Sequence, residues 1–107
     1  MDGPRGPERR AHPRAPYETQ VALVRDGDQV TVASRDLGFG GMYFLSEERP
    51  EIGEAITARW VDGGVSYELD GRVIRHGGDG FAIAFTRITD AGEMALRDLL
   101  KRLLVRS

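Results

Sequence analysis

The 107-residue chain contains no cysteine and only two histidines, which excludes several kinds of chemistry at once. Without cysteine there is no disulfide framework, no thiol nucleophile and no thiolate metal site. Two histidines, His12 and His76, are too few for a histidine metal cluster, and no nucleophile elbow or phosphate-loop motif is present. We therefore expect no catalytic residue, no metal site, no cofactor and no enzymatic activity.

Long hydrophobic runs are also missing. No stretch approaches the ~18–20 uninterrupted apolar residues that a membrane-spanning helix needs, and the N-terminus lacks the apolar run of an export signal. We therefore expect a cytoplasmic protein without membrane insertion. The length and the composition, 40% hydrophobic and 30% charged, are typical of one globular domain.

Lysine is nearly absent, because Lys101 is the only lysine among fifteen basic residues, and the net charge is −2. The charge is unevenly distributed: residues 1–16 hold four arginines against two carboxylates, so this segment is positive and the remainder is negative. A duplex-binding protein usually spreads its basic residues over a whole face, and a single-strand binder needs a row of exposed aromatics. We therefore expect no nucleic acid partner, whereas a small anionic ligand is compatible with this charge pattern.

The chain divides into an arm and a domain. Four of the five prolines lie within residues 1–16, where no hydrophobic periodicity is visible, so we expect a flexible, basic N-terminal arm. From residue 17 onward, six short apolar runs alternate with period two and are separated by glycine-rich turns, as in antiparallel strands. These runs are Tyr17–Arg25, Gln29–Arg35, Met42–Ser46, Ala55–Val61, Val65–Arg75 and Phe81–Thr86.

The period then changes to 3.6 residues in an apolar stripe of Leu96, Leu99, Leu100, Leu103 and Leu104. This predicts a C-terminal helix over residues 90–105, with Asp90 and Glu93 resembling a capping box at its start. Six antiparallel strands followed by one helix predict an all-β fold with a C-terminal helix over residues 17–107. We expect the sheet to close into a six-stranded barrel, since closure removes the exposed edges.

Two segments have the chemistry to bind a ligand. In the arm, Arg10 and Arg14 lie four positions apart with Arg9 beside them, and an arginine fork binds phosphate oxygens or a guanine edge. Between two strands, Asp36 to Gly41 begins with a carboxylate and ends in a double glycine. The carboxylate can accept hydrogen bonds from N1–H and N2–H₂ of guanine, and Gly41 allows a ligand to approach the backbone. Taken separately, the arginines of the arm are better interpreted as solvated charge, and the segment from Asp36 to Gly41 as a bulged turn.

A second glycine cluster, Gly77 to Gly80, has a simpler interpretation. It joins two predicted strands and is typical of a hairpin turn. His76 lies beside it, and we interpret this histidine as a solvated imidazole rather than a general base.

In this order and on this framework, the two candidate segments resemble those of the PilZ domains, small six-stranded barrels with a C-terminal helix that act as bacterial receptors for cyclic di-GMP. The RxxxR motif of that family matches Arg10 to Arg14, and its D/N-x-S-x-x-G motif matches Asp36 to Gly41. Gly38 stands where the family has serine. The missing hydroxyl is expected to weaken ligand binding by about 0.5–1.5 kcal/mol, the contribution of an ordinary hydrogen bond.

The resemblance implies that cyclic di-GMP is the ligand and that the protein signals to an unidentified protein partner when its arm becomes ordered over the ligand. The alternative is a PilZ-like adaptor in motility or polarity control that binds no nucleotide, which Gly38 favours. The ligand-binding residues that the resemblance implies are Arg9, Arg10, Arg14, Asp36, Gly38 and Gly41.

Overall fold

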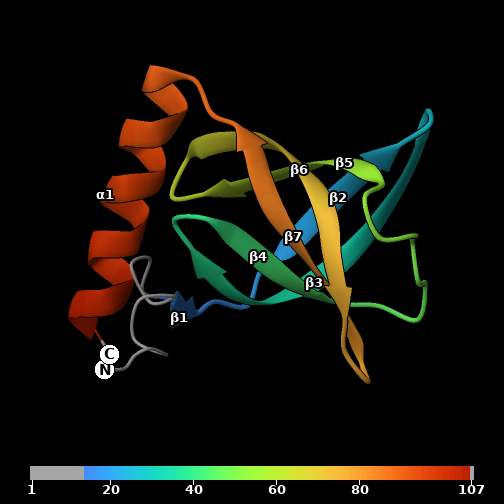
Figure 1. Cartoon of the computed structure of the whole chain (residues 1–107). Coiled ribbons are helices and arrows are strands. Elements are labelled where there is room, and N and C mark those ends of the chain that lie inside the picture. The colour runs from blue at the N-terminus through green and yellow to red at the C-terminus, as the bar shows by residue number, and fades with distance from the viewer. Residues whose placement is uncertain (1–13, 107) are drawn as a thin grey trace, which may run out of the picture.

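The computed structural model describes residues 14–106, which form a six-stranded antiparallel barrel with one additional strand and a C-terminal helix (Figure 1). The elements are β1 (Arg14–Pro16), β2 (Gln20–Arg25), β3 (Asp28–Gly38), β4 (Gly41–Leu45), β5 (Ala55–Asp62), β6 (Val65–His76), β7 (Gly80–Arg87) and α1 (Asp90–Arg106). The expected fold class is therefore confirmed, and the helix is one residue longer than expected.

The barrel closes through an additional pairing between its first and last strands. Six strands follow the order β3-β2-β5-β6-β7-β4, and β4 pairs back with β3. All of these pairings are antiparallel. Closure gives each of the six strands a neighbour on both sides, so their backbone groups have partners within the sheet.

Helix α1 packs against the end of the barrel that carries the β3–β4 and β5–β6 turns (Figure 1). The guanidinium carbon of Arg97 lies 5.3 Å from the ring centre of Phe39 in the β3–β4 turn, and Nη1 of Arg102 lies 3.9 Å from Oδ1 of Asp62, the last residue of β5. Four helix leucines complete the core that the barrel side chains fill: Leu96, Leu99, Leu100 and Leu103.

Two details of the helix differ from the expectation. Leu104 is 40% exposed, because successive residues rotate by about 100° and carry this position to the margin of the stripe. The helix is capped by Thr89 rather than Asp90, since Thr89 Oγ1 accepts a hydrogen bond from the Gly92 amide at 3.0 Å. Asp90 lies in the first turn, where its negative charge interacts favourably with the positive end of the helix dipole.

The predicted boundary between arm and domain at residue 16 is wrong. Arg14 to Pro16 forms β1, with Arg14 opposite Gly38 and Pro16 opposite Asp36, and Ala15 is buried. A strand of three residues is too short to show a hydrophobic period, and proline is tolerated where its nitrogen need not donate to a ladder. The rest of the predicted arm, residues 1–13, lies outside the described residues.

Candidate ligand-binding site

A buried serine holds β1 in place. β1 and β2 lie along the same edge of β3, and residues 17–19 interrupt them. At this break, the Ser34 hydroxyl donates to the Tyr17 carbonyl and accepts from the Thr19 amide at 3.1 Å. Backbone bonds of 2.9 Å flank it, from the Tyr17 amide to the Arg35 carbonyl and from the Ser34 amide to the Thr19 carbonyl. These contacts fix the register of β1 and therefore the position of Arg14.

A β-bulge in β3 places Arg35 and Asp36 on the same face of the sheet. In the pairing of β3 with β4, Ser34 lies opposite Phe44 and Asp36 lies opposite Tyr43, so Arg35 is the extra residue. In a regular strand two consecutive side chains point to opposite faces, and a bulge removes this alternation locally. Both side chains consequently reach the outer surface, with exposed fractions of 46% for Arg35 and 22% for Asp36.

On this outer face, Arg14 and Asp36 form an ion pair. Nε and Nη2 of Arg14 donate to Oδ1 of Asp36 at 2.9 Å and 2.6 Å. Nε of Arg35 donates to Oδ2 of the same carboxylate at 3.3 Å. The structure thus brings together one residue from each of the two motifs and gives both carboxylate oxygens a guanidinium partner.

The two motif glycines lie in the sheet next to this pair. Gly38 is buried at the end of β3, opposite Arg14. Gly41 begins β4 opposite Ala84 of β7, and a Cβ at this position would overlap the carbonyl oxygen of Ile83. Gly41 is therefore required for the close packing of β4 on β7, a reason that the sequence interpretation did not contain. The other two predicted ligand residues, Arg9 and Arg10, lie outside the described residues.

Next to the Arg14–Asp36 pair lies a group of residues that the sequence analysis missed, here called the Tyr43 cluster: Arg35, Tyr43, Arg75 and Asp79. The Tyr43 ring is buried outside the barrel core, with the guanidinium carbon of Arg35 at 3.8 Å and that of Arg75 at 5.3 Å from the ring centre. The Tyr43 hydroxyl donates to Oδ1 of Asp79 at 2.7 Å. This hydrogen bond raises the pKa of Tyr43 and lowers the pKa of Asp79.

The glycine-rich β6–β7 turn makes room for this contact. A Cβ at Gly77 would overlap the Tyr43 hydroxyl, whereas a Cβ at Gly78 would meet no atom within 4 Å. The interpretation of these glycines as a hairpin turn therefore omits a second role, which is that Gly77 leaves room for the Tyr43 hydroxyl. The signal in the sequence was Asp79, a carboxylate within a run of glycines that are not all needed for the turn itself.

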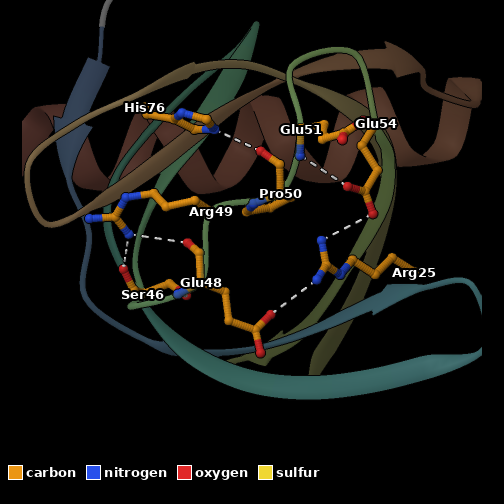
Figure 2. A network of polar contacts seen from close by, with 8 residues as sticks. All are labelled: Arg25, Ser46, Glu48, Arg49, Pro50, Glu51, Glu54 and His76. Carbon is orange, nitrogen blue, oxygen red and sulfur yellow. Dashed lines mark hydrogen bonds and ion pairs between the residues drawn. The ribbon is translucent and has the colours of Figure 1, made fainter.

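The β4–β5 loop supports the same turn, and Figure 2 shows part of its polar network. Nη1 of Arg49 donates to the Glu48 carbonyl at 3.1 Å, and Nη2 donates to the Gly78 carbonyl at 2.9 Å. His76 is exposed, in keeping with a solvated imidazole, but its Nε2 also lies 2.7 Å from the Pro50 carbonyl oxygen, a contact that the sequence did not indicate. Further contacts tie the loop to β2 through Arg25 with Glu48 and Glu54.

Residues 14–106 contain no group of three or more histidine, cysteine, aspartate or glutamate side chains placed to hold a metal ion. Within the same range, no helix has both the length and the apolar character needed to cross a bilayer.

Comparison with known proteins agrees with the fold. The chain matches the PilZ domain family over residues 8–102. Its structure is similar to that of the PilZ domain of CeSA from a cellulose-synthesizing bacterium, with 24% identity, a TM-score of 0.70, and coverage of 84% of this chain and 96% of that one. It is also similar to the Bacillus subtilis inhibitor of motility MotI/DgrA, with 15% identity, a TM-score of 0.73, and coverage of 92% of this chain and 53% of that one. No curated protein sequence matches.

The family match covers most of the chain, and the two structural matches reproduce the same barrel. PilZ domains are cyclic di-GMP-type receptor and adaptor domains without catalytic activity, so the expectation that the chain is not an enzyme is confirmed. Together with the order of the motif residues on β1 and β3, these findings show that the chain belongs to the PilZ domain family.

Proposed function

We propose that this chain is a bacterial, cytoplasmic receptor for cyclic di-GMP and that Arg14 and Asp36 contact the ligand directly. The observation that supports this function best is the contact between them: residues 22 positions apart, from two separate motifs, meet at 2.6 Å on the outer face of the barrel. Gly38, Gly41 and the arginines at positions 9 and 10 complete the proposed site.

Binding exchanges the partners of both charged groups. A guanidinium binds phosphate through two parallel hydrogen bonds, and a carboxylate accepts from N1–H and N2–H₂ of guanine. Arg14 therefore turns from Asp36 to a phosphate while Asp36 takes the guanine edge. Inorganic phosphate would draw Arg14 away from Asp36 without replacing its hydrogen bonds to the carboxylate. A ligand that carries both a phosphate and a guanine replaces them, so it is favoured over inorganic phosphate.

The exchange also suggests how the signal leaves the site. β1 contacts α1 as well as β3. A change in the position of Arg14 therefore acts on the segment before β1 and on the helix that covers one end of the barrel. We propose that ordering of the N-terminal segment over the ligand creates the surface that a protein partner recognises. The ligand shifts this equilibrium only to the extent that it binds the ordered form better.

Isothermal titration of the protein with cyclic di-GMP tests the proposal, with GTP as the control ligand. We expect saturable binding that Arg14→Ala or Asp36→Ala weakens by about 10-fold or more, because hydrogen bonds to charged groups contribute roughly 1.5–3 kcal/mol. Arg59→Ala is the matched control, since Arg59 is 52% exposed on β5, which pairs with neither β3 nor β4. Unchanged affinity in both site variants would contradict the proposed site.

A ligand-independent adaptor is the second candidate, and two observations favour it. Gly38 lacks the serine hydroxyl of the family motif, and both oxygens of Asp36 already have guanidinium partners. In this case the titration gives no heat at high micromolar cyclic di-GMP, and the protein recognises its partner equally well with and without nucleotide.

A further inference from the structure

We propose that Arg35 is a further ligand-contacting residue and that its guanidinium stacks on the guanine base whose edge Asp36 binds. Arg35 belongs to neither motif. This role rests on the proposed function, because it requires a base at Asp36, but it adds a residue and an interaction that the motifs do not contain.

The orientation of Arg35 comes from the bulge in β3. As the extra residue of the bulge, its side chain projects on the same face as Asp36 and extends across β4. Its guanidinium carbon lies 3.8 Å from the centre of the Tyr43 ring, so one face of the guanidinium plane is covered by the ring. The side chain is nevertheless 46% exposed, which leaves the opposite face accessible from solvent.

The ring beneath Arg35 is buried and is anchored by a hydrogen bond. The Tyr43 ring is 1% exposed, and its hydroxyl is held by Asp79 at 2.7 Å. Nη1 of Arg35 lies 3.8 Å from the same Asp79 carboxylate. A free arginine would lose much rotamer freedom on contacting a ligand, whereas an arginine already held against an aromatic ring loses less.

The arrangement suits a purine. A guanidinium is planar and stacks on aromatic rings, and every base offers a π-face. Nε of Arg35 donates to Asp36 at 3.3 Å, and a hydrogen bond from this atom lies in the guanidinium plane. The carboxylate is therefore at the rim of the stacking surface, where the edge of a stacked guanine lies. The order from the sheet outward is then Tyr43, Arg35 and the base.

Titration with cyclic di-GMP of three variants tests this role: Arg35→Ala, Arg35→Lys and the control Arg59→Ala. We expect Arg35→Ala to weaken binding on the order of tenfold, as loss of a stacking partner does. Arg35→Lys should weaken it nearly as much, because an ammonium group keeps the charge but has no plane to stack. Arg59→Ala should bind like the unmodified protein.

Three results would overturn the role of Arg35. Full affinity in Arg35→Lys would show that only the charge matters, and unchanged affinity in Arg35→Ala would show that there is no contact. Tighter binding in Arg35→Ala would show that Arg35 competes with the ligand for Asp36. In each case saturable binding by the unmodified protein leaves the receptor function intact, whereas absence of any binding by that protein overturns both proposals.

A direct readout separates stacking from a structural effect. In a proton–nitrogen correlation spectrum, the Arg35 Nε–H signal, identified by its absence in Arg35→Lys, should move upfield when cyclic di-GMP is added, because the ring current of a stacked base shields it. The Arg59 signal should not move. An Arg35 signal that keeps its position at saturating ligand excludes the stack.

Discussion

Three glycines in or near the site serve different purposes, and the difference decides which of them tolerate a side chain. A Cβ at Gly41 would overlap the Ile83 carbonyl oxygen, and a Cβ at Gly77 would overlap the Tyr43 hydroxyl, so neither position has room for a side chain. Gly38 lies in strand β3 and is not among the residues with positive φ, so its backbone accepts an ordinary side chain.

Gly38→Ser should therefore cause no backbone strain and should bind cyclic di-GMP more tightly. The added hydroxyl supplies the hydrogen bond that the family motif implies, which corresponds to about 0.5–1.5 kcal/mol, or roughly two- to tenfold in affinity. Titration beside the unmodified protein measures it, with Gly78→Ser as the control in an open turn. If only Gly38→Ser binds, the natural chain is the ligand-independent adaptor; if both bind equally, position 38 does not contact the ligand.

Gly77→Ala and Gly78→Ala form a matched pair in one turn. A methyl group at Gly77 displaces the Tyr43 hydroxyl from Asp79, so we expect a loss of about 1–3 kcal/mol in the free energy of unfolding. At Gly78 the methyl group meets nothing, and the change should stay within about 0.5 kcal/mol. Urea unfolding of both variants measures the difference. Equal stabilities would mean that Tyr43 moves aside without cost.

At the scale of elements, β1 depends on one buried hydroxyl. Ser34→Ala removes the bonds to the Tyr17 carbonyl and the Thr19 amide at the break between β1 and β2. We expect a loss of about 1–3 kcal/mol in the free energy of unfolding, since buried polar groups lose their partner. Because β1 carries Arg14, affinity for cyclic di-GMP should fall as well. Ser66→Ala, at an exposed position in β6, is the control for both measurements.

The six barrel strands were predictable from the sequence, whereas β1 and the bulges were not. Alternating residues and glycine-rich turns place each of the six strands within a few residues of its observed position. β1 is too short for a period, and its stability comes from pairing with β3. The bulge at Arg35 leaves no local signal, because it depends on how β3 and β4 pair over their whole length.

At the scale of the whole molecule, all three tyrosines are buried. Burial and the contact with Asp62 raise the pKa of Tyr17, burial raises that of Tyr67, and the hydrogen bond to Asp79 raises that of Tyr43. Tyrosines in the unfolded chain ionise near pH 10. The contribution of these raised pKa values to the stability of the folded chain is therefore fully present below pH 10. It is lost as the pH rises from there toward the tyrosine pKa values of the folded chain.

At high pH, the tyrosines should consequently ionise in the same transition in which the chain unfolds. Each proton that the folded chain keeps and the unfolded chain releases lowers the free energy of unfolding by about 1.4 kcal/mol per pH unit. Tyrosinate absorbance and circular dichroism, recorded together above pH 10, should change in one transition. Tyrosines that titrate near pH 10 while the circular dichroism stays native would contradict this expectation.

The sequence by itself determined the order of six strands and a helix, the position of the two motifs and the membership in the PilZ family, because periodicity and motif spacing are local properties of the chain. Only the tertiary structure decided that Arg14 meets Asp36, that Arg35 lies on the same face, and that Tyr43 supports it from β4. These arrangements depend on how β3 pairs with β1 and with β4. They depend on the register of the closed barrel, which strand patterns do not encode one strand at a time.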